Sequence, residues 1–233
     1  MIVGGGGADM HNMAPAVPDA AVVDLTQATP TYQPVAPLHH ARMHLTATLL
    51  PDRTVLVNGG AMMEESAAMA AFDAEIFDPV TRTWTMGATS RVARLYHSVA
   101  LLVPDGRVVT AGSNPVRRTE ELRIEVYWPP YLFRGARPTI TLADTTAGYG
   151  ETLDATVTGD RPLRWLSLVR PGAGTHSSDN EQRLVDVAFT AQTGDQVGVQ
   201  LPPGPELAPP GWYMLFAVDQ DGIPSDAAWL HLG

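Results

Sequence analysis

The sequence predicts an all-β chain in which two to three blades of a β-propeller are followed by an immunoglobulin-like β-sandwich. A pattern of short strands and turns recurs about every 50 residues up to residue 130. Further strand-like segments follow without that repeat. We therefore expect two domains, residues 1–130 and 131–233, each long enough to bury a core of its own.

The repeat in the first domain consists of identical residues at a fixed spacing. Three pairs lie 53 residues apart: His44 and His97, Pro51 and Pro104, and Gly59 and Gly112. Glu75 and Glu125 recur 50 residues apart, and Asp24-Leu25 marks a weaker, earlier copy. The turn residues Pro104-Asp105-Gly106 separate two strand-like runs, 98–103 and 107–111, which predicts a hairpin. Several short strands in each period of about 50 residues indicate an incomplete kelch-type propeller.

The second domain is predicted from strand patterns and turn residues alone. Its strand-like segments are 139–142, 152–158, 165–169, 184–190, 196–201, 212–218 and 228–232. Their number and length suit an immunoglobulin-type sandwich. The joint at 128–135 is rich in proline, glycine and aromatic residues, so we expect a packed junction between the domains.

Composition excludes several classes of function. The net charge of -10 and the lack of a block of basic residues argue against a nucleic-acid partner. No apolar run is long enough to cross a membrane, and the first residues lack the pattern of a signal peptide. There is no cysteine, so disulfides and thiolate chemistry are excluded within this chain.

The number of blades is too small for a closed ring. Propellers close with about four to eight blades, which protects the edges of their sheets. Roughly 130 residues at this period supply fewer than three. We therefore expect a fragment or a degenerate relative of a longer protein, with the missing N-terminal blades as natural partners and with a tendency to aggregate or pair.

Motifs in both domains resemble the galactose oxidase and glyoxal oxidase family of copper radical oxidases. In the last repeat they are Arg94-Leu95-Tyr96-His97-Ser98 and Gly112-Ser113-Asn114-Pro115. In the second domain they are Gly174-Thr175-His176-Ser177, Pro210-Gly211-Trp212-Tyr213-Met214 and Gly222-Ile223-Pro224-Ser225. The resemblance covers most of residues 40–233 and implies that the sandwich is the family's early-set domain.

The resemblance implies one copper ion held by Tyr96, His97 and His176, with Tyr96 also acting as proton acceptor. The donor types are coherent by themselves, because imidazoles and a phenolate suit the tetragonal N/O arrangement that Cu(II) prefers. Successive side chains of a regular strand point to opposite faces. We therefore expect irregular backbone at Tyr96 and His97, with His176 reaching them from a loop rich in glycine and proline.

The resemblance also implies oxidation of a primary alcohol or aldehyde, or of a carbohydrate, by O2 to give H2O2, in a secreted protein. The family's radical tyrosine and its cysteine partner are not encoded here, since cysteine is absent and Tyr32 lies in the wrong repeat context. Activity would thus belong to a longer copper-dependent oxidase. The alternative is a non-catalytic binding or structural module that uses no metal.

Several other residues are weaker candidates for a functional role. Met10 and His11 follow the glycines of the first copy, where we expect a substrate contact at the mouth of the site. His39, His40 and His44 lack a recognisable metal spacing and are expected to be structural or exposed. The methionines at 62, 63 and 69 are expected to fill gaps. Asp179 and Glu181 are expected to be solvated or to pair with Arg183.

Overall fold

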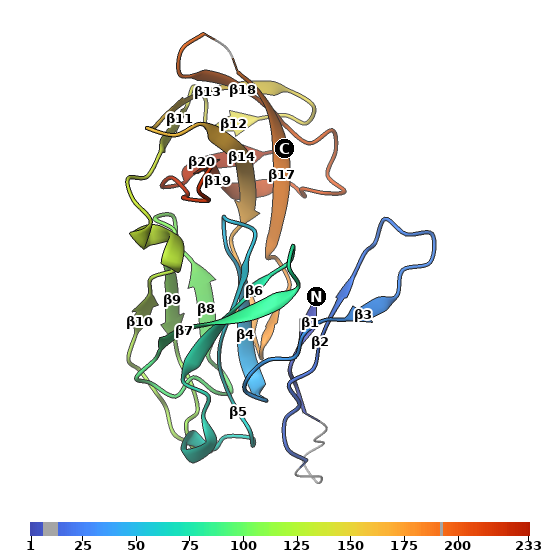
Figure 1. Cartoon of the computed structure of the whole chain (residues 1–233), viewed down its shortest axis with the longest axis vertical. Helices are drawn as coiled ribbons and strands as arrows, with labels where there is room; N and C mark the ends of the chain where they lie inside the picture. Colours follow the sequence, from blue (N-terminus) through green and yellow to red (C-terminus); the bar gives the residue numbers. More distant parts are fainter. Residues whose placement is uncertain (7–13, 192) are drawn as a thin grey trace.

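The structure is a computed structural model that describes residues 1–6, 14–191 and 193–233, and its described residues form two parts (Figure 1). Almost all regular structure is β. Two short 3-10 helices occur in the described residues, η1 (Ala67–Met69) and η2 (Pro130–Phe133). The first lies in the blade loop at 64–71, whose residues favour a helical turn, and the second forms the joint between the parts. No described helix has the length and apolar character needed to span a membrane.

The first part consists of three antiparallel sheets, each built from strands that follow one another in the chain. The first sheet contains β1 (Ile2–Val3), β2 (Ala20–Val23) and β3 (Tyr32–Pro34). The second contains β4 (Met43–Leu49), β5 (Val55–Ala61), β6 (Asp73–Asp78) and β7 (Thr83–Thr89). The third contains β8 (Val99–Leu102), β9 (Val108–Ala111) and β10 (Glu125–Tyr127). This succession of small sheets is propeller-like, with β4 and β8 as neighbouring strands of adjacent sheets.

The repeated turns form tight hairpins, as the sequence predicts. Between β8 and β9, the Gly106 amide donates to the Val103 carbonyl, and Gly106 has a φ of +81°. Between β4 and β5, Arg53 holds the equivalent left-handed position with a φ of +71° and bonds the Leu50 carbonyl. Glycine adopts this conformation without a steric penalty, whereas arginine does not.

A buried ion pair fixes the centre of the second sheet. Arg42 and Glu75 have no exposed side-chain surface, and their Nη2 and Oε1 atoms lie 2.7 Å apart. Arg42 also donates to the carbonyls of Gly59 and Asp73, and Glu75 accepts the backbone and imidazole N–H groups of His39. Burial opposes ionisation of Glu75, but these hydrogen bonds and the charge of Arg42 together lower its pKa.

The second part is a sandwich in which β17 belongs to both sheets. One sheet has the order β11-β13-β18-β17 and the other β17-β14-β19-β20-β12. The strands are β11 (Thr139–Leu142), β12 (Thr146–Ala147), β13 (Thr152–Thr158), β14 (Leu163–Arg170), β17 (Arg183–Ala191), β18 (Gln196–Gln200), β19 (Gly211–Asp219) and β20 (Ala228–Leu232). All seven segments predicted from the sequence form strands, and β12 is an additional short strand.

Strand β19 shows why the two parts cannot be separated without exposing apolar surface. Its odd-numbered residues, among them Tyr213 and Leu215, lie in the sandwich core. Its even-numbered residues, among them Met214 and Phe216, lie in a second cluster with residues of the first part such as Leu102. Because side chains alternate along a strand, one strand serves both cores. The predicted firm contact between the parts is therefore present.

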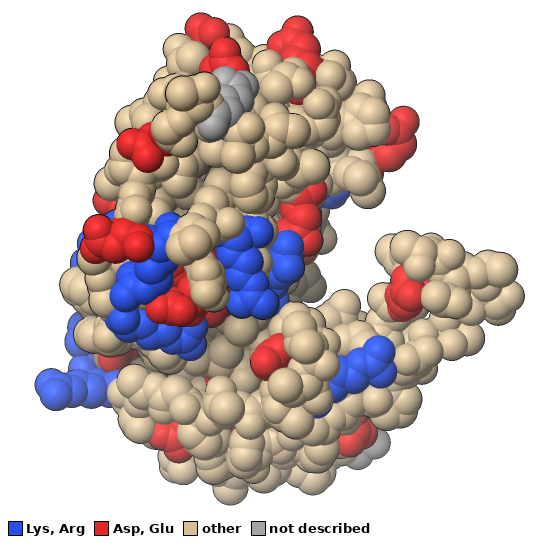
Figure 2. All heavy atoms as spheres, turned by 45° about the horizontal axis from the view of Figure 1, so that its top comes forward, with Lys and Arg blue, Asp and Glu red and all other residues tan. Residues whose placement is uncertain are grey.

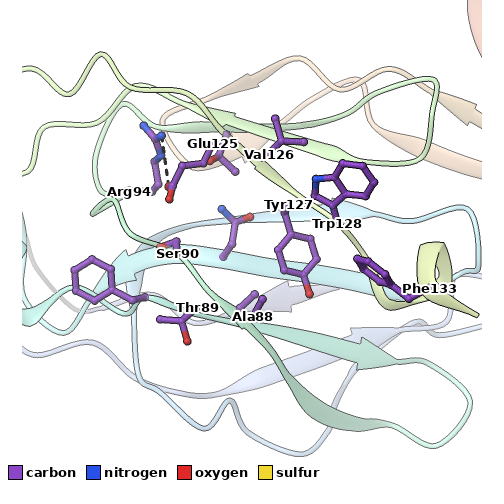
Figure 3. Close-up of a pocket in the computed structure, with 13 residues that line it drawn as sticks. Ala88, Thr89, Ser90, Arg94, Glu125, Val126, Tyr127, Trp128 and Phe133 are labelled. Carbon is purple, nitrogen blue, oxygen red and sulfur yellow. Dashed lines mark ion pairs between the residues drawn. The ribbon is translucent and has the colours of Figure 1, made fainter.

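The joint at η2 packs through one aromatic residue only. Tyr131 is fully buried in the cluster shared by the two parts, and its hydroxyl donates to the Gly106 carbonyl. Trp128 and Phe133 are 51% and 72% exposed, and their ring centroids lie 6.3 Å apart. They lie on the wall of a hollow of about 530 Å³ (Figure 3).

Arginines gather on one face between the two parts, interspersed with carboxylates (Figure 2). At this junction Trp165 of β14 lies between two guanidinium groups. Arg53 from the first part lies 4.2 Å from its ring centroid, and Arg164 of the sandwich lies 4.6 Å from it. Arg53 also pairs with Asp186 of β17 at 2.9 Å. These contacts add cation–π attraction to the apolar packing.

The hollow in Figure 3 lies between the sheet edge at β10 and strand β7. Arg94 and Glu125 form an ion pair at one end, with 3.6 Å between Nη2 and Oε2. Tyr127 crosses toward β7, where a Cβ atom on Gly87 would lie 2.5 Å from its hydroxyl. In the described residues the third sheet has no strand beyond β10, whereas the second sheet has β7 at that position.

We expect Glu75→Gln to lower the free energy of unfolding at pH 7 by about 3–5 kcal/mol, because it leaves the buried charge of Arg42 without a counter-charge. Because folding lowers the pKa of Glu75, the carboxylate stabilises the fold above its ordinary pKa of 4.5 and loses this effect as pH falls. Urea unfolding at several pH values measures the free energy of unfolding and its dependence on pH. The difference between wild type and variant should shrink below about pH 4.5.

Asp226→Asn serves as the control, because its carboxylate is 74% exposed and pairs with Arg137 at the surface. We expect no measurable change in stability for this variant. Equal losses in the two variants, or no loss in Glu75→Gln, would contradict the role assigned to the buried pair.

Candidate metal centre

Tyr96 and His97 lie in an irregular turn that immediately precedes β8. The Ser98 amide donates to the Leu95 carbonyl at 3.0 Å, which closes the turn, and His97 has a φ of +62°. Gly112 has a φ of +69°, and a Cβ atom there would lie 2.7 Å from the His97 carbonyl oxygen. The irregular backbone predicted at these two residues is therefore present, and Gly112 gives it room.

His176 occupies the tip of a hairpin formed by β15 (Gly174–Thr175) and β16 (Ser178–Asp179). His176 and Ser177 form the two-residue loop, with φ values of +51° and +62°. Two positive φ angles characterise a type I′ turn, which strongly favours asparagine, aspartate and glycine. Histidine and serine are unusual there. Local strain of this kind tends to concentrate at functional sites.

The hairpin leaves the sandwich between β14 and β17 and is anchored to the first part by Gln182. The Gln182 side chain accepts the Leu49 amide at 2.5 Å and donates to the Ala47 carbonyl at 3.0 Å. The Gln182 amide group therefore satisfies one N–H and one carbonyl of β4, as a neighbouring strand would. Asp179 stabilises the base of the hairpin by accepting the amides of Ala173, Glu181 and Gln182.

These two segments bring three aromatic rings together. The ring centroids of Tyr96 and His97 lie 3.9 Å apart, those of His97 and His176 lie 5.0 Å apart, and those of Tyr96 and His176 lie 5.5 Å apart. His97 and His176 are exposed and Tyr96 is half-buried. The cluster thus combines residues 79 positions apart in the chain and is open to small molecules.

Asn114 determines which nitrogen of His97 is free. Its amide nitrogen donates to the Thr119 carbonyl at 2.5 Å, which directs the amide oxygen toward His97. That oxygen lies 2.5 Å from Nδ1 of His97, so Nδ1 carries the proton. The lone pair of Nε2 then remains available for a metal. For His176, Nδ1 lies 2.7 Å from the Thr175 hydroxyl, which can either donate or accept.

The donor set fits a metal only if the phenol takes part. In the described part of the chain, no three His, Cys, Asp or Glu side chains are grouped so that they could hold an ion. Two imidazoles and one phenol oxygen, however, suit Cu(II) or another borderline divalent metal. The fixed tautomer of His97 is the arrangement usual for ligating histidines. The residues present are therefore compatible with copper.

His44 lies beside the cluster. It is expected to be structural or exposed, and its ring lies 5.0 Å from that of Tyr96 in a T-shaped contact. It is half-buried, and burial lowers its pKa against the opposing charges of Glu64 and Glu65. The repeat pairs His44 with His97, which is the sequence signal for its place near the cluster.

The remaining candidates lie apart from the cluster or are not described. Met10 and His11 fall outside the described residues. His39 and His40 are exposed and contact the carboxylates of Glu75 and Asp73. Glu181 pairs with Arg170 and not with Arg183, so that expected pairing is wrong.

Two family models match successive parts of the chain. The Glyoxal oxidase N-terminus model matches residues 7–131, and the Galactose oxidase-like, Early set domain model matches residues 137–232. Together with the strand order, they confirm the predicted succession of a propeller-like part and an early-set sandwich.

Curated proteins with similar sequences include several oxidases. A galactose oxidase from Gibberella zeae is 30% identical over 84% of this chain and 30% of its own length. The aldehyde oxidase GLOX from Vitis pseudoreticulata is 34% identical over 79% of this chain and 40% of its own length. A WSC domain-containing protein from Arthroderma benhamiae is 35% identical over 79% of this chain and 21% of its own length. The chain thus spans between a fifth and two fifths of these relatives.

A solved structure confirms the likeness of fold. A fungal alcohol oxidase of the AA5 family, determined in complex with copper, superposes with a TM-score of 0.86 at 27% sequence identity. The match covers 94% of this chain and 48% of that protein.

We expect Gln182→Ala to loosen the hairpin that carries His176, because it removes both hydrogen bonds to β4. Hydrogen exchange of the Leu49 amide should accelerate by about tenfold, which corresponds to the loss of about 1–1.5 kcal/mol from one hydrogen bond. Gln196→Ala, in the sandwich, is the matched control and should leave this amide unchanged. Unchanged exchange at Leu49 in Gln182→Ala would show that the anchor is unimportant.

Proposed function

The chain belongs to the glyoxal oxidase and galactose oxidase family, and we propose that it forms the copper-binding C-terminal portion of an oxidase. In this proposal Tyr96, His97 and His176 are the metal donors that this chain contributes. The observation that carries the proposal is the convergence of their rings within 3.9–5.5 Å, although His176 comes from a separate part of the molecule.

The domain division expected from the sequence is part of this proposal. Residues 1–130 would supply propeller blades with Tyr96 and His97, and residues 131–233 would supply the sandwich with the His176 hairpin. The shared apolar cluster and the Gln182 anchor support a rigid relation between the donors. Rigid donors favour tight binding, because little conformational freedom is lost when the ion binds.

The proposed reaction is oxidation of a primary alcohol or a small aldehyde, with O2 reduced by two electrons to H2O2. When bound, copper supplies a one-electron redox couple and an open position for a substrate oxygen. Tyr96 accepts the proton of the substrate hydroxyl as general base. Asn114 holds His97 in the tautomer that leaves Nε2 free. The exposed imidazole rings leave room for a small substrate to approach.

Of the two electrons that the substrate loses, the one-electron couple of copper accounts for one. We propose that the acceptor of the other electron lies elsewhere in a longer protein. The family resemblance implies a tyrosine joined to a cysteine, and these 233 residues contain no cysteine. The relatives named above are much longer than this chain, which supports a site completed by further blades. We also propose a secreted location, in keeping with O2-dependent oxidation outside the cell.

Copper titration of the purified chain, followed by EPR, tests the proposal. We expect one Cu(II) per chain with a tetragonal signal, and a loss of at least about tenfold in affinity in His176→Ala. His231→Ala, in β20 of the sandwich, is the matched control and should bind copper as the wild type does. Equal copper affinity in wild type and His97→Ala would contradict the proposal.

We expect Asn114→Ala to weaken copper binding by about 10–100-fold while leaving the fold intact, because the hydrogen bond from His97 to Asn114 orients the ligating ring. The same titration measures the affinity, and circular dichroism monitors the fold. Glu120→Ala, at an exposed position of the same loop, is the matched control and should bind copper as the wild type does. Wild-type affinity in Asn114→Ala would contradict the orienting role.

A further inference from the structure

We propose that His44 is a positioning residue for Tyr96: its imidazole ring fixes the plane in which the phenol presents its oxygen to the metal. This inference rests on the proposed function, in which Tyr96 is a copper donor. His44 would act through the ring of Tyr96 and not by donating a nitrogen to the metal.

The first argument is the environment of the Tyr96 ring. The torsion that rotates a tyrosine ring is broad, so its rotamer alone does not fix the ring plane. The imidazoles of His97 and His176 contact this ring, but both are proposed metal donors whose own orientation depends on the ion. His44 contacts it independently, with ring centroids 5.0 Å apart and ring planes 63° apart. A T-shaped contact of this kind is a favourable and directional aromatic arrangement.

The second argument is that His44 and His97 occupy equivalent positions in the two repeats. They lie 53 residues apart. His44 lies within β4, and His97 lies two residues before the neighbouring strand β8. Both have left-handed backbone, with φ values of +59° and +62°. Between the partner pairs Met43–Ala61 and Leu45–Gly59, His44 lies opposite Gly60 of β5, which also has left-handed backbone, with a φ of +84°.

The left-handed backbone explains how the same residue type serves two purposes. A left-handed residue departs from the extended backbone on which the alternation of side chains in a regular strand depends. In the later repeat the redirected histidine follows Tyr96 and is a proposed donor. In the earlier repeat the residue before the histidine is Met43, which is buried and lacks an oxygen donor. The redirected His44 instead reaches across to the tyrosine of the next repeat.

The left-handed backbone at His44 carries an energetic cost that simple packing of the core would not require. Non-glycine residues in left-handed backbone are uncommon, although histidine is enriched among the exceptions. Such positions are energetically unfavourable and cluster at functional sites. His44 is also only half-buried, so the sheet does not need its ring to close an apolar core.

The test compares His44→Ala with His44→Phe in the full chain, using competitive copper titration. Phenylalanine keeps a ring at this position but has no nitrogen. We expect His44→Ala to weaken Cu(II) binding by about tenfold or more, as orienting partners of metal ligands do. His44→Phe should stay within about threefold of wild type. If His44→Phe binds as weakly as His44→Ala, or if His44→Ala binds as tightly as wild type, the proposal is wrong.

A double-mutant cycle with Tyr96→Phe separates positioning from general packing. When the phenol oxygen is gone, the orientation of the ring no longer matters for the metal. His44→Ala should then cause no further loss of affinity in the Tyr96→Phe background. An additional loss equal to that seen in the wild-type background would overturn the proposal.

NMR of the metal-free chain distinguishes failure of this inference from failure of the proposed function. The ring protons of Tyr96, assigned by their loss in Tyr96→Phe, should shift clearly in His44→Ala and less in His44→Phe. His231→Ala should leave them unchanged. If copper does not bind but these shifts occur, the proposed function fails and the ring contact stands. If the Tyr96 signals are the same in wild type and His44→Ala, the positioning role is refuted whatever the copper result.

Discussion

The docking of one hairpin on the propeller-like part is the constraint on which the candidate site depends. His176 comes from the sandwich and approaches Tyr96 and His97 only because the hairpin runs down beside β4 and β8 (Figure 1). Ordering such a segment costs roughly 1–2 kcal/mol per residue in backbone entropy. Gln182 and Asp179 offset this cost with hydrogen bonds that satisfy backbone groups of both parts.

The strands were predictable because their signals are local. Turn residues and alternating β-formers located all seven main strands of the sandwich and the hairpin at residues 104–106. Strands of only two residues, such as β15 and β16, carry too little pattern to be recognised. The packing of Tyr131 and the exposure of Trp128 and Phe133 depend on long-range contacts, which residue type alone does not determine.

The candidate site was predictable only in part. Spacing could not bring His176 to the other two residues, and the resemblance to a known family supplied that grouping. The repeat pairs His44 with His97, but spacing alone does not show that the ring of His44 lies against Tyr96 of the next repeat. The site residues also conflict with local preference, since three histidines have left-handed backbone. Such conflicts between local and overall structure are common where function constrains the chain.

The position of Trp165 between Arg53 and Arg164 bears on how the molecule responds to its surroundings. Dissolved ions weaken the attraction between exposed opposite charges such as the Arg53–Asp186 pair, and at 0.1 M ionic strength they largely remove it beyond about 10 Å. An indole stacked against guanidinium planes also makes close dispersion contacts, which dissolved ions affect much less. The contact of Arg53 with Trp165 across the two parts is therefore expected to depend less on salt concentration than the Arg53–Asp186 pair does.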